Sequence, residues 1–144
     1  MEPVDTPCVC TTLRMATRAV NQVYDTALAS SGLRATGYTI LARLGGDGAM
    51  SITQLAHRLT LERTTCSREL QPLVDAGLVE LRRGGDRRRR DAHLTPAGEA
   101  RLARARPHWE RAQERVIARF GDAETKTLLA ALRELRATAQ SLTT

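Results

Sequence analysis

The sequence predicts a mainly α-helical protein that carries one small β-hairpin. Most of the chain places apolar residues at helical spacing. The stretch 82–91 holds six arginines together with Gly84 and Gly85, and glycine supplies the positive φ that a tight hairpin turn needs. Residues 78–81 and 93–94, on either side of this turn, have strand character. A basic hairpin that follows two short helices is the outline of a winged helix-turn-helix, in which the wing has two or three strands.

The charge of the chain favours a nucleic-acid partner. The 144 residues are enough for one domain with a modest core, and the net charge is +6, with Lys126 as the single lysine. Arginine binds phosphates and guanine edges through paired hydrogen bonds. An anionic membrane surface is the weaker alternative. Aromatic residues make up 3% of the chain, which argues against a surface that stacks single-stranded bases.

Several classes of protein are not expected from this sequence. No apolar run approaches the length of a membrane span, and the N-terminus lacks the basic start of a signal peptide. Three cysteines fit a reducing cytoplasm better than a disulfide framework. The three histidines are scattered, without catalytic or zinc-finger spacing, and no glycine-rich phosphate loop follows a strand. We therefore expect a cytoplasmic protein, associated with the nucleoid when bound to DNA, that is not an enzyme and needs no cofactor or metal.

Two helices are expected before the helix-turn-helix. An arm over residues 1–11, with Pro3 and Pro7, precedes a helix over 12–30 that ends at Gly32. A second helix is expected over 36–44. The glycine-rich stretch 45–48 is expected to form the turn after it.

The next two helices form the expected DNA-reading unit. Ser51 and Gln54 have the spacing of a capping box, which starts a helix. The helix after it, from about Glu62 to Gly77, has an apolar face and an opposite polar face, and Pro72 is expected to kink it beyond the residues that reach bases. The polar face suits a major groove; an ordinary solvated face is the alternative, which the basic hairpin that follows disfavours. The polar face contains Thr64, Ser67, Arg68 and Gln71, with Arg63 beside them.

Two long helices complete the chain. Thr95 and Pro96 are suited to begin a helix, which runs to about Phe120 with a bend at Pro107. The last helix carries a narrow apolar seam of coiled-coil type. Packing against a partner chain is favoured over packing within one chain. The seam consists of Leu128, Leu132, Leu135, Ala139 and Leu142.

In the order of its elements, the chain resembles the MarR family of bacterial repressors. The residues that carry this resemblance lie at the start of the capped helix, along the following helix, at its end, at the tip of the hairpin and at the start of the long helix. They are Leu55-Ala56, Arg63-Thr64-Thr65-Cys66-Ser67-Arg68, Ala76-Gly77-Leu78-Val79, Asp86-Arg87-Arg88 and Leu94-Thr95-Pro96-Ala97-Gly98. The resemblance covers nearly the whole chain.

The resemblance implies a six-helix obligate dimer that binds a palindromic operator in double-stranded DNA. It implies a single domain over 1–144, in which 36–96 bind DNA and 1–35 and 97–144 dimerise. It also implies that Arg88 enters the minor groove, that Asp86 orients it, and that Cys66 replaces a larger aliphatic core residue. The candidate DNA contacts are Arg63, Thr64, Thr65, Ser67, Arg68, Gln71, Arg83, Asp86, Arg87, Arg88, Arg89 and Arg90.

Cys8 and Cys10 are the candidate sensor of a signal. They could be unremarkable thiols, could bind a thiophilic metal or arsenite, or could sense oxidants, which is the favoured interpretation. The OhrR-like peroxide sensors of this family carry a reactive cysteine at the start of the first helix, where Cys10 falls. Tyr24 matches the first of their two tyrosines, whereas Ala35 occupies the second position. Fourteen helical residues span about 21 Å, so any contact between Cys10 and Tyr24 must cross the dimer axis.

We expect Cys10 to be oxidised to a sulfenic acid and Cys8 to resolve it as a disulfide that unwinds the start of the first helix. Two rival functions remain open. One is a MarR-type repressor released by a small aromatic or phenolic ligand bound between the DNA-binding and dimerisation parts. The other is an architectural protein that coats DNA without sequence preference.

Overall fold

The computed structural model describes residues 7–86 and 88–144. Arg87, a predicted DNA contact, and residues 1–6 of the predicted arm lie outside the described residues. The chain divides into two compact units, one ending at Trp109 and one beginning at Glu110. Six α-helices and one three-stranded sheet form the described part of the chain, which confirms the predicted fold class.

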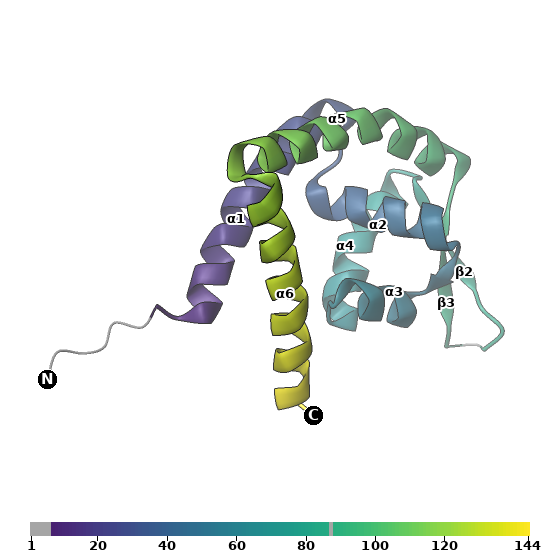
Figure 1. Ribbon diagram of the computed structural model, residues 1–144. Helices are drawn as coiled ribbons and strands as arrows, with labels where there is room; N and C mark the ends of the chain where they lie inside the picture. The colour runs from purple at the N-terminus through teal and green to yellow at the C-terminus, as the bar shows by residue number, and fades with distance from the viewer. Residues whose placement is uncertain (1–6, 87) are drawn as a thin grey trace, which may run out of the picture. The chain divides into compact units, whose positions relative to one another are not determined.

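The first unit holds most of these elements (Figure 1). In chain order they are α1 (Val9–Leu28), a 3-10 turn η1 (Ala29–Ser31), α2 (Ala35–Asp47), β1 (Met50–Ser51), α3 (Ile52–Leu59), α4 (Arg63–Asp75), β2 (Val79–Arg83), β3 (Arg90–Leu94) and the first part of α5 (Pro96–Phe120). The rest of α5 and α6 (Asp122–Leu142) make up the second unit.

Helix α1 begins three residues earlier than predicted, at Val9. Cys8 has an extended backbone, with φ −65° and ψ 121°, and its carbonyl accepts the N–H of Thr12 at 2.9 Å. Cys8 is therefore the N-cap, and Cys10 lies inside the first turn and not in a loose arm. The helix ends at Leu28, two residues early, because η1 and Gly32, at φ 75°, complete the turn.

Helix α2 continues through two of the glycines that were expected to form a turn. That prediction was wrong for Gly45 and Gly46, which are helical, and right for Gly48, at φ 82°. Gly45 is needed for packing: a Cβ there would lie 3.0 Å from Cδ2 of Leu102 on α5. The absence of a side chain at Gly45 lets α2 and α5 approach closely. A prediction of turns from neighbouring glycines takes no account of such packing.

The sheet places the wing beside the start of α3. Strand β3 is central, with β2 on one side and the two-residue β1 on the other. Ala92 of β3 pairs with Leu81 of β2 and with Met50 of β1, both antiparallel. Because α3 begins at the residue after β1, and Ser51 of β1 pairs with Asp91 of β3, the N-terminus of α3 is held beside the end of β3 that is nearest the hairpin tip (Figure 1).

The core of the first unit joins the helix-turn-helix to the sheet. Fully buried side chains come from every layer, including Leu41 of α2, Leu55 of α3, Leu70 of α4 and Val79 of β2. Cys66 is among them, with no exposed surface, and burial raises the pKa of its thiol. Its predicted place in the core is confirmed.

Large apolar side chains remain exposed on helices of both units. On α1 these are Val9, Met15, Val20 and Val23, and at the end of α5 and on α6 they are Phe120, Leu128, Leu129 and Leu142. No residue of α6 is buried. Helix α1 therefore exposes much of its apolar surface in one chain.

Candidate nucleic-acid interface

Helix α4 presents the predicted polar face to solvent. Thr64, Ser67 and Arg68 are exposed on it, while Cys66 and Leu70 on the opposite side are buried in the core. Thr65 is half-buried. Gln71 is exposed, and its side-chain amide donates to Asp75 at 2.8 Å within the same helix. The helix continues through Pro72 to Asp75.

Both ends of α3 have defined caps. The capping box at the start of α3 is confirmed: Ser51 Oγ accepts from the N–H of Gln54 at 3.1 Å, and Gln54 Oε1 accepts from the N–H of Ser51 at 3.0 Å. Helix α3 ends at Leu59, and its C-cap Thr60 has a positive φ of 54°, a conformation that a β-branched residue rarely adopts. The N–H of Thr60 donates to the carbonyl oxygen of His57 at 3.2 Å.

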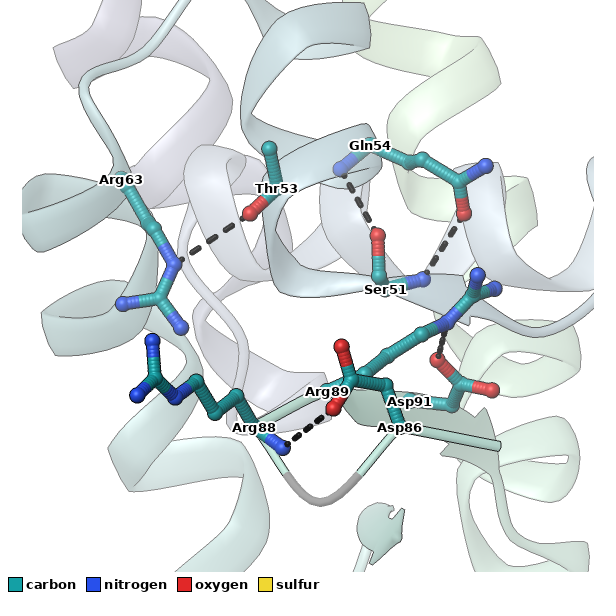
Figure 2. Close-up of polar contacts among 8 residues, drawn as sticks. All are labelled: Ser51, Thr53, Gln54, Arg63, Asp86, Arg88, Arg89 and Asp91. Atoms are coloured by element: carbon teal, nitrogen blue, oxygen red, sulfur yellow. Dashed lines mark hydrogen bonds and ion pairs between the residues drawn. The ribbon is translucent and has the colours of Figure 1, made fainter. Parts of the chain in front are cut away.

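Arg63 is tied to α3 and not to its own helix. Its Nε donates to Thr53 Oγ1 at 3.3 Å (Figure 2). This bond connects the first residue of α4 with the first turn of α3. Thr53 was not among the predicted site residues, and no local pattern could identify it, because the two residues are ten apart and separated by the turn.

The wing tip is closed by backbone bonds and by Asp86. The N–H of Gly84 donates to the carbonyl of Arg89 at 2.9 Å, and the N–H of Arg89 donates to the carbonyl of Asp86 at 3.0 Å. The Asp86 carboxylate accepts the backbone N–H of Arg88 at 3.4 Å (Figure 2). Asp86 therefore acts on the backbone of the turn, and no bond to the Arg88 guanidinium is found among the described residues.

The wing arginines fall into two groups. Arg82 pairs with Glu80 at 3.0 Å, and Arg89 pairs with Asp91 at 2.8 Å. Arg82 lowers the pKa of the Glu80 carboxyl through that hydrogen bond and its charge. Arg83, Arg88 and Arg90 are exposed and form no ion pair within the described part of the chain. They are the wing cations available to a phosphate.

The predicted sensor residues are not brought together within one chain. Cys8 and Cys10 are both exposed at the start of α1. Tyr24 lies on the same unbroken helix, about 21 Å further along it. Its ring is 6.4 Å from that of Trp109, which stacks on Tyr38 at 5.5 Å. Burial raises the pKa of the Tyr24 hydroxyl.

Cys8 lies at the start of α1, where its thiol is activated. The backbone N–H of Thr11, then its hydroxyl, then the backbone N–H of Cys10 lower the pKa of the Cys8 thiol, although their geometry falls short of a capping hydrogen bond. Helix N-termini favour thiolates because their first N–H groups have no helical partner. The first turn of α1 contains no acidic residue that would oppose this effect.

Other kinds of site are not found in the described residues. No group of three or more histidine, cysteine, aspartate or glutamate side chains could hold a metal ion there. Over the same residues, none of the helices is both long enough and apolar enough to cross a lipid bilayer.

The chain is similar to known DNA-binding proteins in sequence and in fold. A helix-turn-helix domain family matches residues 38–82. No curated protein matches the sequence. The crystal structure of the M. tuberculosis transcriptional regulator MosR in complex with DNA is 35% identical, with a TM-score of 0.81 over 92% of this chain and 98% of that one.

Two further structures share the fold. A probable transcriptional regulator from Pseudomonas aeruginosa is 25% identical, with a TM-score of 0.79 over 88% of this chain and 96% of that one. A cysteine-to-serine mutant of E. coli MarR complexed with operator DNA is 18% identical, with a TM-score of 0.79 over 88% of this chain and 92% of that one. The chain therefore belongs to the MarR family of winged helix-turn-helix proteins and is a DNA-binding transcriptional regulator, not an enzyme.

Proposed function

We propose that the chain is a cytoplasmic homodimeric repressor that binds a palindromic operator and releases it when Cys8 and Cys10 are oxidised. Residues 36–96 bind DNA, and 1–35 and 97–144 dimerise. The observation that carries the proposal is the pairing of an exposed hydrogen-bonding face on α4 with a wing whose Arg83, Arg88 and Arg90 have no ion-pair partner among the described residues.

Three kinds of DNA contact are assigned. The predicted residues of α4 other than Arg63, with Arg68 as the principal reader, contact base edges in the major groove. Arg88 enters the minor groove. Arg83, Arg87 and Arg90 neutralise phosphates. Asp86 supports Arg88 by holding the backbone of the turn, and Arg89, held by Asp91, braces the wing.

Exposed apolar surface supports the dimer. Leu142 is 80% exposed and Met15 68% exposed. Burying such side chains stabilises an assembly by about 25 cal/mol per Å². A two-fold dimer places two copies of α4 on one face of the DNA, so half-site centres are expected about 34–36 Å apart.

The proposed redox trigger lies in the first turn of α1. The lowered pKa of the Cys8 thiol supports reversing the roles of the two thiols relative to the sequence-based expectation. The Cys8 thiolate attacks a peroxide oxygen, which releases water or an alcohol and leaves a sulfenic acid on Cys8. The Cys10 thiol then attacks this sulfur and expels water, and a disulfide forms. Cys8 is the N-cap and Cys10 lies in the first turn of α1. Positions two apart do not face each other along a helix, so we expect that the bridge requires Val9 and Cys10 to leave the helix.

Operator binding by reduced and peroxide-treated protein tests this function. The wild-type protein should prefer its operator over random DNA at several salt concentrations, and peroxide should abolish that preference. Equal affinity for both DNAs would support a non-specific architectural protein instead. Arg88→Ala should weaken operator binding while the dimer persists.

Sulfenic-acid trapping with dimedone tests the order of the thiols. Cys10→Ser should accumulate the dimedone adduct at Cys8, whereas Cys8→Ser should react slowly. The opposite pattern would restore Cys10 as the attacking thiol. If the double variant Cys8→Ser, Cys10→Ser still releases DNA with peroxide, the thiol trigger is wrong.

A second candidate trigger is a small aromatic ligand. The observation that favours it is the ring cluster of Tyr24, Tyr38 and Trp109, which joins α1, α2 and α5 within the first unit. An inserted planar ligand would separate α1 from α2. Release by such a ligand after all three cysteines are changed to serine, with quenching of Trp109 fluorescence, would select this candidate.

A further inference from the structure

A cleft opens where the start of α3, the start of α4 and the wing meet. It is lined by Ser51 and Thr53 from the start of α3, Arg63 from α4, and Asp86, Arg88 and Arg90 from the wing. The three elements are held together by the pairing of β1 with β3, in which Ser51 lies opposite Asp91. Among the described residues, four arginines line the cleft, against the single carboxylate of Asp86.

The charge inside the cleft is not neutralised by the protein. The fourth arginine, Arg89, is taken up by Asp91. Arg63, Arg88 and Arg90 have no ion pair within residues 7–86 and 88–144. Figure 2 shows the guanidinium groups of Arg63 and Arg88 pointing toward one another. Two cations that face each other across one cleft repel, and an anion between them would remove that repulsion.

Backbone donors add to this preference for an anion. The capping box uses the side chain and the N–H of Ser51 and the N–H of Gln54. The N–H groups of Ile52 and Thr53 are in the first turn of α3, where no helical carbonyl can accept them. Free N–H groups at a helix start, together with arginines, bind phosphate oxygens.

We propose that this cleft binds one backbone phosphate of the operator in each half-site, and that Thr53 positions Arg63 for it. The inference rests on the proposed operator binding. Thr53 occupies Nε of Arg63 and leaves both terminal nitrogens free for two parallel bonds to one phosphate. Arg63 is then a backbone contact and not a base reader.

The position of this phosphate matters for operator recognition. The phosphate lies on the DNA strand between the major-groove segment that α4 contacts and the minor-groove segment that the wing enters. One phosphate held by both elements fixes the wing relative to α4 on the DNA. The major-groove and minor-groove contacts are thereby kept in register.

Single neutral phosphates in the operator test the inference. Operator duplexes, each with one methylphosphonate at successive positions, are titrated with the wild-type protein and with Arg63→Gln, Thr53→Val and Arg82→Gln. At one position per half-site, the wild-type protein should lose about tenfold in affinity, the worth of a hydrogen-bonded charge. Arg63→Gln should lose a similar factor on unmodified DNA and nothing further at that position.

The two other variants refine the result. Thr53→Val should give a smaller loss, about two- to threefold, which disappears when Arg63→Gln is also present. Arg82→Gln, whose side chain is paired with Glu80 outside the cleft, should keep the full methylphosphonate effect. Unchanged thermal unfolding of all three variants checks that they fold.

Two results would overturn the inference. If the loss caused by each methylphosphonate simply adds to the loss caused by Arg63→Gln at every position, Arg63 binds no particular phosphate. If the Thr53→Val loss persists in the presence of Arg63→Gln, Thr53 does not act through Arg63. Inorganic phosphate should compete better than chloride at equal ionic strength with the wild-type protein but not with Arg63→Gln, because the cleft accepts a phosphate group. If the wild-type protein has no preference for the operator, the proposed function itself fails.

Discussion

Thr60 holds a conformation that costs the protein stability. Its φ of 54° and ψ of 46° are left-handed, although a β-branched side chain is crowded there. We expect Thr60→Gly to raise the free energy of unfolding by about 1 kcal/mol. Glycine removes the backbone strain of the folded state, and part of this gain is lost because glycine also increases the conformational entropy of the unfolded chain. Urea unfolding followed by Trp109 fluorescence measures the free energy of unfolding. Thr60→Ala, which keeps a Cβ, should gain less, and a destabilised glycine variant would contradict the argument.

The Cys8 thiol should react at lower pH than an ordinary cysteine. Its pKa is lowered by the N–H and hydroxyl of Thr11, so a larger thiolate fraction persists as the pH falls below the usual thiol range. Thr11→Val removes only the hydroxyl and should move the pH profile of Cys8 alkylation upward. Mass mapping after iodoacetamide treatment measures the profile. Buried Cys66, whose pKa is raised, is the internal slow control, and identical profiles for both proteins would rule out a role for the hydroxyl.

The start of α5 packs so closely against the backbone of Leu78 that only glycine fits at position 98. Thr95 Oγ1 donates to the carbonyl of Gly77 at 2.6 Å and accepts from the N–H of Gly98 at 3.0 Å. A Cβ on Gly98 would overlap the carbonyl oxygen of Leu78. We expect Gly98→Ala to destabilise the protein by about 2 kcal/mol or more, since backbone must move. The measurement is the free energy of unfolding in urea.

Gly46 provides the matched control for that substitution. It is helical, and a Cβ there would meet nothing within 4 Å. Gly46→Ala should therefore stabilise the protein by about 0.5–1 kcal/mol. If the two alanine variants had the same effect, helix propensity and not the close approach to Leu78 would explain Gly98.

The polar face of α4 should determine sequence preference. Arg68 is exposed on it, without an ion pair among the described residues. We expect Arg68→Ala to relax preference at one base pair per half-site, by about 1–3 kcal/mol against the wrong base. Binding selection from randomised operators measures it. A uniform loss on all sequences would reassign Arg68 to the backbone.

At the scale of the whole molecule, dimerisation should depend on the α6 seam. Leu128 is 43% exposed. Leu128→Glu places a charge on this apolar seam, so we expect monomers and a large loss of operator affinity, because two half-sites are no longer bound together. Ala137 lies nine residues further along α6, which is two and a half turns, and therefore on the opposite face of the helix. Ala137→Glu should leave the dimer intact. Sedimentation velocity measures the state; a dimeric Leu128→Glu protein would place the interface elsewhere.

Much of the fold could be predicted because its signals are local. The capping box of Ser51 and Gln54 and the core position of Cys66 follow from spacing along one helix. The predictions failed where packing overrules a local rule. Gly45 and Gly46 look like a turn in the sequence, yet both are helical, and Gly45 lies where a Cβ would approach Leu102 of α5. The expected loose arm was wrong at Cys8 and Cys10, because Cys8 is the N-cap and the helix starts at Val9.

The sequence by itself determined the class of the protein, the polar face of α4 and the basic wing, because periodicity, capping and turn residues act between neighbours in the chain. Only the tertiary structure decided which arginines remain unpaired, that Thr53 holds Arg63, and that Arg63 and Arg88 share one cleft. These residues meet because β1 pairs with β3 and brings the start of α3 to the wing. When strand pairing brings distant segments together, the residues that come into contact show no periodic pattern in the sequence, so the contact cannot be predicted from it.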